Sequence, residues 1–587
     1  MDRNDSRIRF LKGISDYLWD RTDSQGMLKC YKHHVEHTGK NVYSVIIDSK
    51  LYELTKDEAY FEKAKKRVER TLGNLRKRED GVWVFYPGNF DARNASNNLI
   101  DAGACIDSLC FFLDRFSDKL SADEVERIKD CIFKVSDTYL IRKCPEENFI
   151  NQRLWGCTGL AAAYRIFNEK SWKSAVLETL ERSFKEQNSD GSFPYLPYPF
   201  NKEENTHIGD SDITSYYHSR HVAFAIDAME KMGVKWWTDK IKKGVDFQIG
   251  ITHPDGIREM NFEAKRWYWE SKYEVGSNPF DIYNLVRGYE REGDPLYRRY
   301  AALSFNQLLR HQLKDGGITS HLGKQQNYKC RIFWNAHAAW AAKVIEDVPL
   351  EPVPLPGKQL SYFKESGVVK FENEDYCVIL RGRKKPMNIS FGGSIGGGSM
   401  VYLGTREGGW RNLLDMDEWK DQIDNNFVLH LPSRGVVKET REFMEENGRD
   451  CSRRLYKAWA ELRAGNILFS LNYPIRHILG RYLDELGNVY TSQWSTDSKT
   501  TLGKDSVRFV LRPAKRDGKE LEKTEITRAY EFDGGGIRIG EKLKSEDRIK
   551  KVDYRNNRCL AIIKEGGKTE DGKLVIEKDL KFSLTTP

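Results

Sequence analysis

A short polar stretch in the first half of the chain carries side chains suited to acid–base chemistry. Tyr216, Tyr217, His218, Arg220 and His221 lie within six residues. They directly precede VAFAIDAMEKMG, whose apolar spacing predicts a helix. Such polar groups are costly to bury without partners. The stretch therefore predicts either a hydrogen-bonded cluster at a helix start or a catalytic site.

Three further polar groups occur where a loop is predicted to lead into a helix. They are Asn151 and Arg153; Trp269 and Glu270, within RWYWESKYE; and Arg331, Asn335 and His337. These residue types suit β-elimination on a uronic acid, in which a base such as Tyr or His removes the C5 proton and an acid protonates the leaving oxygen. Asn, Arg or His donors must neutralise the adjacent carboxylate. A tyrosine base requires a lowered pKa, which a neighbouring positive field favours.

The chain up to residue 345 has a helical pattern. Apolar residues recur at helical spacing in 60–75, 99–116, 124–140 and 173–187, and small residues dominate 154–167 and 336–345. Asp-Gly pairs at 80–81, 190–191, 255–256 and 315–316 follow helical segments, and the loop 144–151 stands where a further turn is expected. A period of about 60 residues fits a helix pair. Five to six pairs predict an (α/α) toroid whose loops share one rim, with an irregular helical bundle as the alternative.

The second half of the chain has a different pattern. EDVPLEPVPLPGK (346–358) cannot continue a helix and predicts an extended linker. After it, strand patterns recur, among them 376–382, 387–393, 400–405, 466–475, 506–513, 526–532, 535–544, 559–564 and 573–579. We therefore expect a toroid domain over 1–345 and an antiparallel β-sandwich over 359–587. The Gly-rich 391–410 lacks the context of a phosphate-binding loop and predicts turns.

Two local patterns, NQRLWGCTGLAAA (151–163) and DGSFPYLP followed by SYYHSRHVAF (190–224), resemble segments of the heparinase II/III-like and alginate-lyase-type polysaccharide lyases. A toroid followed by a β-sandwich is similar to the same family. The resemblance implies a lyase acting on an acidic, uronate-containing poly- or oligosaccharide. It also implies that Asn151 neutralises the carboxylate and that Tyr217 is acid or base, with His218 beside it.

We expect the site to combine these residues with others from the same polar groups. The expected catalytic residues are Tyr217, His218, Asn151 and His337. The expected substrate-binding residues are Arg153, Tyr216, Arg220, His221, His207, Glu270, Trp269, Asn335 and Tyr402. Alternatives are a glycoside hydrolase, for which Asp210, Asp212, Glu270, Asp101 and Asp107 are candidate carboxylates; a uronate C5-epimerase; and a non-catalytic glycan-binding protein.

The charge and composition of the chain exclude some classes of binding partner. The net charge of +8 comes without a basic arm or recognition motif, so we expect no nucleic-acid partner. No apolar stretch reaches about 18 residues, and the N-terminus lacks an apolar signal region, so we expect no membrane partner. Ten scattered cysteines indicate a reducing compartment, which predicts a cytoplasmic location. No cofactor is expected, although a structural Ca²⁺ or Zn²⁺ stays an alternative; the His33, His34, His37 run is interpreted as surface.

Overall fold

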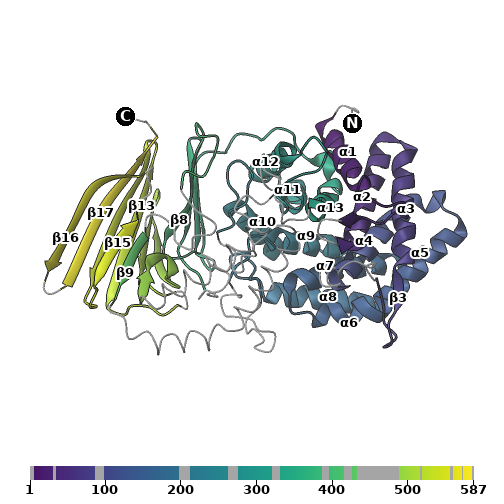
Figure 1. Ribbon diagram of the computed structural model, residues 1–587, viewed down its shortest axis with the longest axis horizontal. Coiled ribbons are helices and arrows are strands. Elements are labelled where there is room, and N and C mark those ends of the chain that lie inside the picture. Colours follow the sequence, from purple (N-terminus) through teal and green to yellow (C-terminus); the bar gives the residue numbers. More distant parts are fainter. Residues whose placement is uncertain are drawn as a thin grey trace. The chain divides into compact units, whose positions relative to one another are not determined.

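The computed structural model describes residues 5–30, 35–36, 38–85, 98–196, 212–261, 275–319, 331–385, 395–414, 426–431, 488–515, 518–555, 560–570 and 573–584. The chain forms two compact units, one helical and one of β-strands (Figure 1). Unit 1 comprises Met1–Gln187, Tyr217–Gln248 and Glu274–Pro354; unit 2 comprises Asn188–Tyr216, Ile249–Tyr273 and Leu355–Pro587. The polar stretch at 216–221 is thus divided between the units after Tyr216.

Six helices form a closed inner ring in unit 1. They are α2 (Thr38–Thr55), α4 (Asn98–Phe116), α7 (Ile150–Phe167), α9 (His218–Lys231), α11 (Asn278–Glu292) and α13 (Arg331–Ala342). Each contacts the next, and α13 returns to α2. The outer helices are α1 (Ser6–Trp19), α3 (Glu58–Gly73), α5 (Ala122–Val135), α6 (Ile141–Glu146), α8 (Lys170–Lys185), α10 (Asp239–Gly250) and α12 (Pro295–His311). The predicted (α/α) toroid is confirmed.

Outer helices form because one face is apolar and their first turns are capped. In α5, Ile128, Ile132 and Val135 are buried at helical spacing, and Ser121 and Glu124 form a capping box at its start. The inner ring is closest between α4 and α7. A side chain at Gly159 would place its Cβ 2.6 Å from the carbonyl oxygen of Gly103, so both positions require glycine. This close packing explains the small residues of 154–167.

All six inner helices run in one direction. Near their starts, the amide of Gly39 in α2 donates to Asp101 in α4, and Arg220 in α9 binds the backbone just before α11. Further along the helices, Lys343 after α13 reaches Asp107 in the middle of α4 and Asp227 near the end of α9. The helix dipoles are therefore aligned, with partial positive charge at the N-terminal end of the barrel and partial negative charge at the C-terminal end.

Aromatic rings fill the middle of the barrel. The ring centroids of Trp155 and Phe224 are 5.0 Å apart, and those of Phe224 and Trp340 are 5.1 Å apart. Phe280 joins them with its centroid 5.4 Å from that of Trp340, and Tyr43 stacks on Trp155 at 5.8 Å. Five inner helices thus contribute to one apolar layer, which separates the two ends of the barrel.

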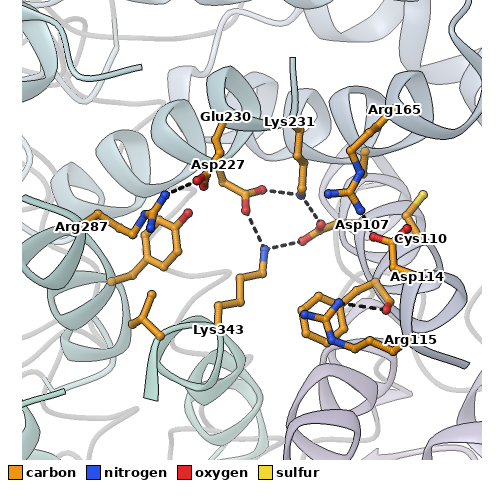
Figure 2. Close-up of a pocket in the computed structure, with 14 residues that line it drawn as sticks. Asp107, Cys110, Asp114, Arg115, Arg165, Asp227, Glu230, Lys231, Arg287 and Lys343 are labelled. Atoms are coloured by element: carbon orange, nitrogen blue, oxygen red, sulfur yellow. Dashed lines mark hydrogen bonds and ion pairs between the residues drawn. The ribbon is translucent and has the colours of Figure 1, made fainter. Parts of the chain in front are cut away.

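The C-terminal end of the barrel is closed by an ion-pair square of Asp107, Asp227, Lys231 and Lys343 (Figure 2). Lys343 Nζ lies 3.0 Å from a carboxylate oxygen of each aspartate, and Lys231 also pairs with both. The square lies beside a cavity of about 220 Å³. Burial opposes ionisation of Asp107, but Lys231 and Lys343 outweigh it and lower its pKa to about 2.

One loop type recurs where an outer helix leads to the next inner helix. In each loop the glycine amide donates to the carbonyl oxygen of the residue three positions earlier. The amide of that earlier residue donates to the carbonyl oxygen of the residue after the glycine. Each glycine has φ between 81° and 91°, which favours glycine. The five glycines are Gly26, Gly81, Gly191, Gly256 and Gly316. Gly26 follows Gln25 instead of an aspartate, so the Asp-Gly pattern in the sequence does not identify this loop. The sixth connection, between Glu146 and Ile150, lacks this loop.

Unit 2 consists of antiparallel sheets, which confirms the predicted β-sandwich. One sheet has the order β5 (Gln359–Phe363), β6 (Val368–Glu372), β7 (Tyr376–Arg381) and β8 (Ser399–Thr405). A second has the order β10 (Val489–Thr491), β9 (Asn426–His430) and β15 (Lys551–Arg555). The largest has the order β11 (Ser498–Leu502), β12 (Ser506–Leu511), β13 (Thr524–Asp533), β14 (Gly536–Ser545), β17 (Lys573–Ser583) and β16 (Ala561–Glu570).

Contacts between the sheets build the core of unit 2. Phe371 of β6 stacks on Phe532 of β13 at 4.5 Å, and Tyr376 donates to the carbonyl oxygen of Gly536 at 2.8 Å. The described parts of the segments 188–216 and 249–273 belong to this unit and make polar contacts with its strands. Arg381 donates to Asp212 at 2.7 Å, and Lys370 donates to the carbonyl oxygen of Thr252 at 2.7 Å. The predicted strands at 387–393 and 466–475 lie outside the described residues.

Among the described residues, no helix is long and apolar enough to cross a membrane. No group of three or more His, Cys, Asp or Glu residues among the described positions is arranged to hold a metal ion. The run of His33, His34 and His37 lies outside those positions.

The ion-pair square predicts a defined acid sensitivity. Lys343→Met leaves Asp107 and Asp227 with one ammonium instead of two, so we expect the free energy of unfolding to fall by about 3–5 kcal/mol at neutral pH. Asp107 has a lowered pKa, so its contribution is present above its unfolded pKa of about 3.9 and is lost as the pH falls towards 2. The variant should therefore begin acid unfolding at higher pH than the wild type.

Denaturant titrations at several pH values test this expectation. Lys185→Met is the matched control, because Lys185 pairs with Glu181 on the exposed side of α8 and such pairs contribute little. Equal losses in the two variants would show that the square does not stabilise the barrel.

Candidate active site

The N-terminal half of the barrel interior contains a polar cluster around Arg220. Its guanidinium donates to the Ser277 hydroxyl at 3.0 Å and to the Gly276 carbonyl oxygen at 3.1 Å. It also lies 4.8 Å from the ring centroid of Phe280 and 5.7 Å from that of Tyr217. Arg220 is buried, so this positive charge is fixed between the starts of α9 and α11.

His337 of α13 lies at the base of this cluster. Its ring centroid is 4.5 Å from that of Phe333, 5.2 Å from Phe280 and 5.8 Å from Trp155. Burial lowers the pKa of His337 well below its usual value, and the positive charges of Arg220 and Lys40 lower it further. The imidazole is therefore neutral at physiological pH.

His221 of α9 has a comparable environment. It is fully buried, and burial lowers its pKa well below the usual value for histidine. His218, Arg153 and Arg220 act in the same direction. A neutral imidazole can accept a proton or a hydrogen bond, so both His221 and His337 are in the state that a general base requires.

Lys40 of α2 was not foreseen as a site residue. Its Nζ lies 4.4 Å from the ring centroid of Trp155, 4.8 Å from that of Phe333 and 5.9 Å from that of Tyr43. Burial lowers the pKa of Lys40 to about 8, against an opposing effect of Asp101 and with a contribution from Arg220. Compared with the usual 10.5, this corresponds to about 3 kcal/mol of unfavourable burial of the charged form.

Asp101 of α4 supplies a negative charge to this cluster. One of its carboxylate oxygens accepts a hydrogen bond of 3.2 Å from the amide of Gly39, and a side chain at position 39 would collide with it. Among the described side chains of the cluster, Lys40 and Arg220 are therefore opposed by one carboxylate. The starts of the inner helices add partial positive charge, which makes this end of the barrel suited to an anionic ligand.

Tyr217 and Asn151 occupy the first positions of two inner helices. Tyr217 is the N-cap residue of α9, and Asn151 is the second residue of α7. Both are partly exposed, in contrast to His221 and His337. Asn151 Oδ1 is buried and accepts no hydrogen bond from the described residues. Both residues lie at the N-terminal end of the barrel.

Three other predicted site residues of unit 1 make contacts with the scaffold. His218 Nε2 lies 2.7 Å from the carbonyl oxygen of Gly244, and its ring packs against Phe247 of α10. Asn335 bonds both backbone groups of Ile318, in the loop before α13. Arg153 is directed to the outer helix α8, where it donates to Ser183 and pairs with Glu186. Their predicted roles towards a substrate stay predictions.

Two predicted residues belong to unit 2. Tyr216 is buried there. Tyr402 of β8 is also buried and donates its hydroxyl to the carbonyl oxygen of Trp410 at 2.7 Å. Its ring stacks on His253 at 3.8 Å, and His253 Nε2 lies 3.0 Å from Glu259. Burial raises the pKa of Tyr402 well above its usual value. His207, Trp269 and Glu270 lie outside the described residues.

Sequence periodicity contained a signal for Lys40. Lys40 is in phase with Tyr43 and Ile47 in α2, where every residue from Thr38 to Ser49 is buried. A charged residue in phase with the buried apolar residues of an inner helix is rare without a function or a partner. Such a residue is found by asking which charged positions fall in phase with the core.

The fold of the chain is similar to that of several solved proteins. No protein-family model and no curated protein sequence matches the chain. A solved structure of a tyrosine-to-alanine variant of chondroitin AC lyase from Streptomyces coelicolor matches 97% of this chain and 70% of its own, with 11% identity and a TM-score of 0.50. Heparinase III matches 93% of this chain and 74% of its own, with 12% identity and a TM-score of 0.43.

A third solved structure matches a smaller share of the chain. Unsaturated glucuronyl hydrolase from a Bacillus species matches 58% of this chain and 95% of its own, with 16% identity and a TM-score of 0.41. The likeness to chondroitin AC lyase extends over both halves of the chain. It confirms the predicted fold, a helical toroid followed by β-sheets as in polysaccharide lyases.

The buried histidines give a prediction about protonation. Because burial and nearby cations lower the pKa of His221 and His337, we expect both imidazoles to stay neutral between about pH 5 and 8. Nitrogen chemical shifts of histidine-labelled protein measure this, with signals assigned through His221→Gln and His337→Gln. The partly exposed His430 provides the signal of an accessible imidazole. Titration of either buried ring near pH 6.5 would contradict the assigned environment.

Proposed function

We propose that the protein is a polysaccharide lyase that cleaves an acidic, uronate-containing glycan by β-elimination. The observation that carries this proposal is the N-terminal end of the barrel, where Arg220 and Lys40 face one described carboxylate and two neutral imidazoles. Such a site favours an anionic sugar. The fold shared with chondroitin AC lyase supports the same class of substrate.

The proposed reaction begins with neutralisation of the uronate carboxylate. Arg220 and Asn151 are the donors we assign to it, because each stands at the start of an inner helix and Asn151 is partly exposed. Hydrogen bonds from these groups stabilise the negative charge that develops when the C5 proton leaves. The same donors bind the ground-state carboxylate more weakly, which is the condition for catalysis.

Tyr217 is the acid–base residue we assign to the proton transfers. It is partly exposed, and the guanidinium of Arg220 lies 5.7 Å from its ring, where a positive charge favours the phenolate. As the phenolate removes the C5 proton, the electrons of that bond form the C4–C5 double bond and the C4–oxygen bond breaks. The leaving oxygen takes up a proton from Tyr217 or from a second acid, so no water is consumed.

His218 and His337 keep supporting roles in this proposal. His218 is the first residue of α9 and holds that helix against α10 through Gly244. His337 is fully buried between Phe333, Phe280 and Trp155, so we assign it to positioning Arg220 and the rings rather than to direct proton transfer. Both roles remain proposals.

The competing functions give different products. A glycoside hydrolase needs two carboxylates flanking the bond, and Asp101 is the acidic group of the described cluster. An epimerase removes the same C5 proton but returns it without breaking the chain. A non-catalytic glycan-binding protein changes no bond.

A panel assay with uronate glycans of different sulfation distinguishes these functions. We expect new reducing ends to appear together with the ultraviolet absorbance of an unsaturated uronate. Reducing ends without that absorbance would indicate a hydrolase. Exchange of the C5 hydrogen with deuterated solvent without cleavage would indicate an epimerase, and binding without any of these changes would indicate a glycan-binding protein.

Substitution of Tyr217 tests the assigned acid–base residue. Tyr217→Phe removes the hydroxyl and keeps the ring, so turnover should fall by about 10²–10⁴-fold while affinity for the glycan stays within a few-fold. Steady-state kinetics and calorimetric binding measure the two effects. Tyr52→Phe is the control, because Tyr52 lies near the other end of α2 and donates to the exposed Glu58. Unchanged turnover in Tyr217→Phe would remove Tyr217 from the mechanism.

A further inference from the structure

Lys40 is a buried ammonium that finds no hydrogen-bond acceptor among the described residues. It is fully buried near the start of α2, and its Nζ makes no hydrogen bond to that part of the chain. An ammonium group has three donors, and leaving them unsatisfied away from water is costly. Burying the Lys40 ammonium is therefore unfavourable, and neither side-chain packing nor helix formation requires a lysine at this position.

Aromatic rings define the surroundings of the ammonium group. Trp155 of α7, Phe333 of α13 and Tyr43 of α2 lie within 6 Å of Nζ. Contacts with ring faces attract a cation but offer no lone pair for its N–H groups. The rings thus hold a charged lysine in place while they leave its hydrogen-bonding capacity unused.

The neighbouring charges leave the positive charge of Lys40 without a direct partner. Asp101 of α4 directs a carboxylate oxygen to the amide of Gly39, and Lys40 Nζ makes no hydrogen bond to the described residues. Arg220 of α9 is a second cation whose charge disfavours that of Lys40. The starts of the parallel inner helices add further positive potential. A bound anion would accept hydrogen bonds from the Lys40 ammonium and balance the positive charge at this end of the barrel.

We propose that Lys40 is a carboxylate-binding residue that recognises the uronic acid unit of the substrate, a role that rests on the proposed lyase function. Its flexible four-carbon stem lets Nζ turn from the rings towards an anion without movement of α2. The same residue then distinguishes an acidic sugar from its neutral counterpart, because only the acidic sugar offers an acceptor of opposite charge.

The charge state of Lys40 makes this recognition pH-dependent. Burial and Arg220 lower the pKa of Lys40 to about 8, while Asp101 and Cys105 of α4 oppose that shift, and the neighbouring His337 of α13 is neutral. Below this pH the lysine is charged and binds an anion. Above it the charge is lost, so affinity for an acidic sugar should fall as the pH rises through about 8.

Calorimetry with two matched oligosaccharides tests the proposal: a uronate oligosaccharide and the same molecule with its carboxyl groups reduced to alcohols. We expect Lys40→Met to weaken binding of the acidic ligand by at least about 10-fold at pH 7 and to leave the neutral ligand unchanged. Lys40→Arg should retain part of the preference for the acidic ligand. Lys50→Met on the same helix is the control, because Lys50 already pairs with Glu53 and Glu346.

Thermal unfolding separates recognition from a structural role. Because Lys40→Met removes an unfavourably buried charge, the variant should unfold at the same temperature as the wild type or higher. Lower affinity for both ligands together with a lower unfolding temperature would overturn the proposal. Wild-type affinity of Lys40→Met for the acidic ligand, or a pH dependence near 8 that survives the substitution, would overturn it as well.

The outcomes distinguish this inference from the proposed function. If the wild type forms no unsaturated product but binds the acidic ligand through Lys40, the lyase proposal fails and the anion recognition stands. If the wild type forms the product while Lys40→Met binds and reacts normally, the recognition proposal alone fails.

Discussion

The parallel course of the six inner helices is the constraint on which the barrel depends. Each outer helix returns the chain so that the next inner helix starts at the same end, and the contact of α13 with α2 closes the ring. Glycines such as Gly103 and Gly159 bring the backbones of α4 and α7 close enough for this closure. Aligned helices sum their dipoles, so one end of the barrel favours anions and the other favours cations.

The two ends meet this electrostatic condition differently. At the C-terminal end, Lys231 and Lys343 are matched by Asp107 and Asp227, and the charges form a closed square (Figure 2). At the N-terminal end, the buried cations Lys40 and Arg220 lie near the carboxylate of Asp101, and His221 and His337 are neutral. A layer of aromatic rings separates the ends. The first arrangement stabilises the protein by itself, whereas the second is completed by an anionic ligand, as the proposed lyase chemistry requires.

Periodicity predicted much of the fold because helices and strands leave local patterns. The small residues of 154–167 and the Asp-Gly turns correctly indicated close-packed helix pairs in a toroid. Site residues were harder to assign. Arg153 and Asn335 have the side chains of a binding site, yet their described contacts hold the scaffold. Lys40 is in phase with buried residues of its helix, but a lysine in a helix is ordinarily exposed, and the rings from three helices that surround it are brought together by tertiary packing.

We propose that the N-terminal end of the barrel binds the carboxylate of a uronic acid. A crystal structure of the Tyr217→Phe variant with a bound uronate oligosaccharide is the decisive measurement. We expect a sugar carboxylate within hydrogen-bond distance of the Arg220, Asn151 or Lys40 side chains, with the sugar ring over the starts of α7 and α9. An oligosaccharide bound instead beside the ion-pair square of Asp107 and Lys343, or on the six-stranded sheet, would contradict it.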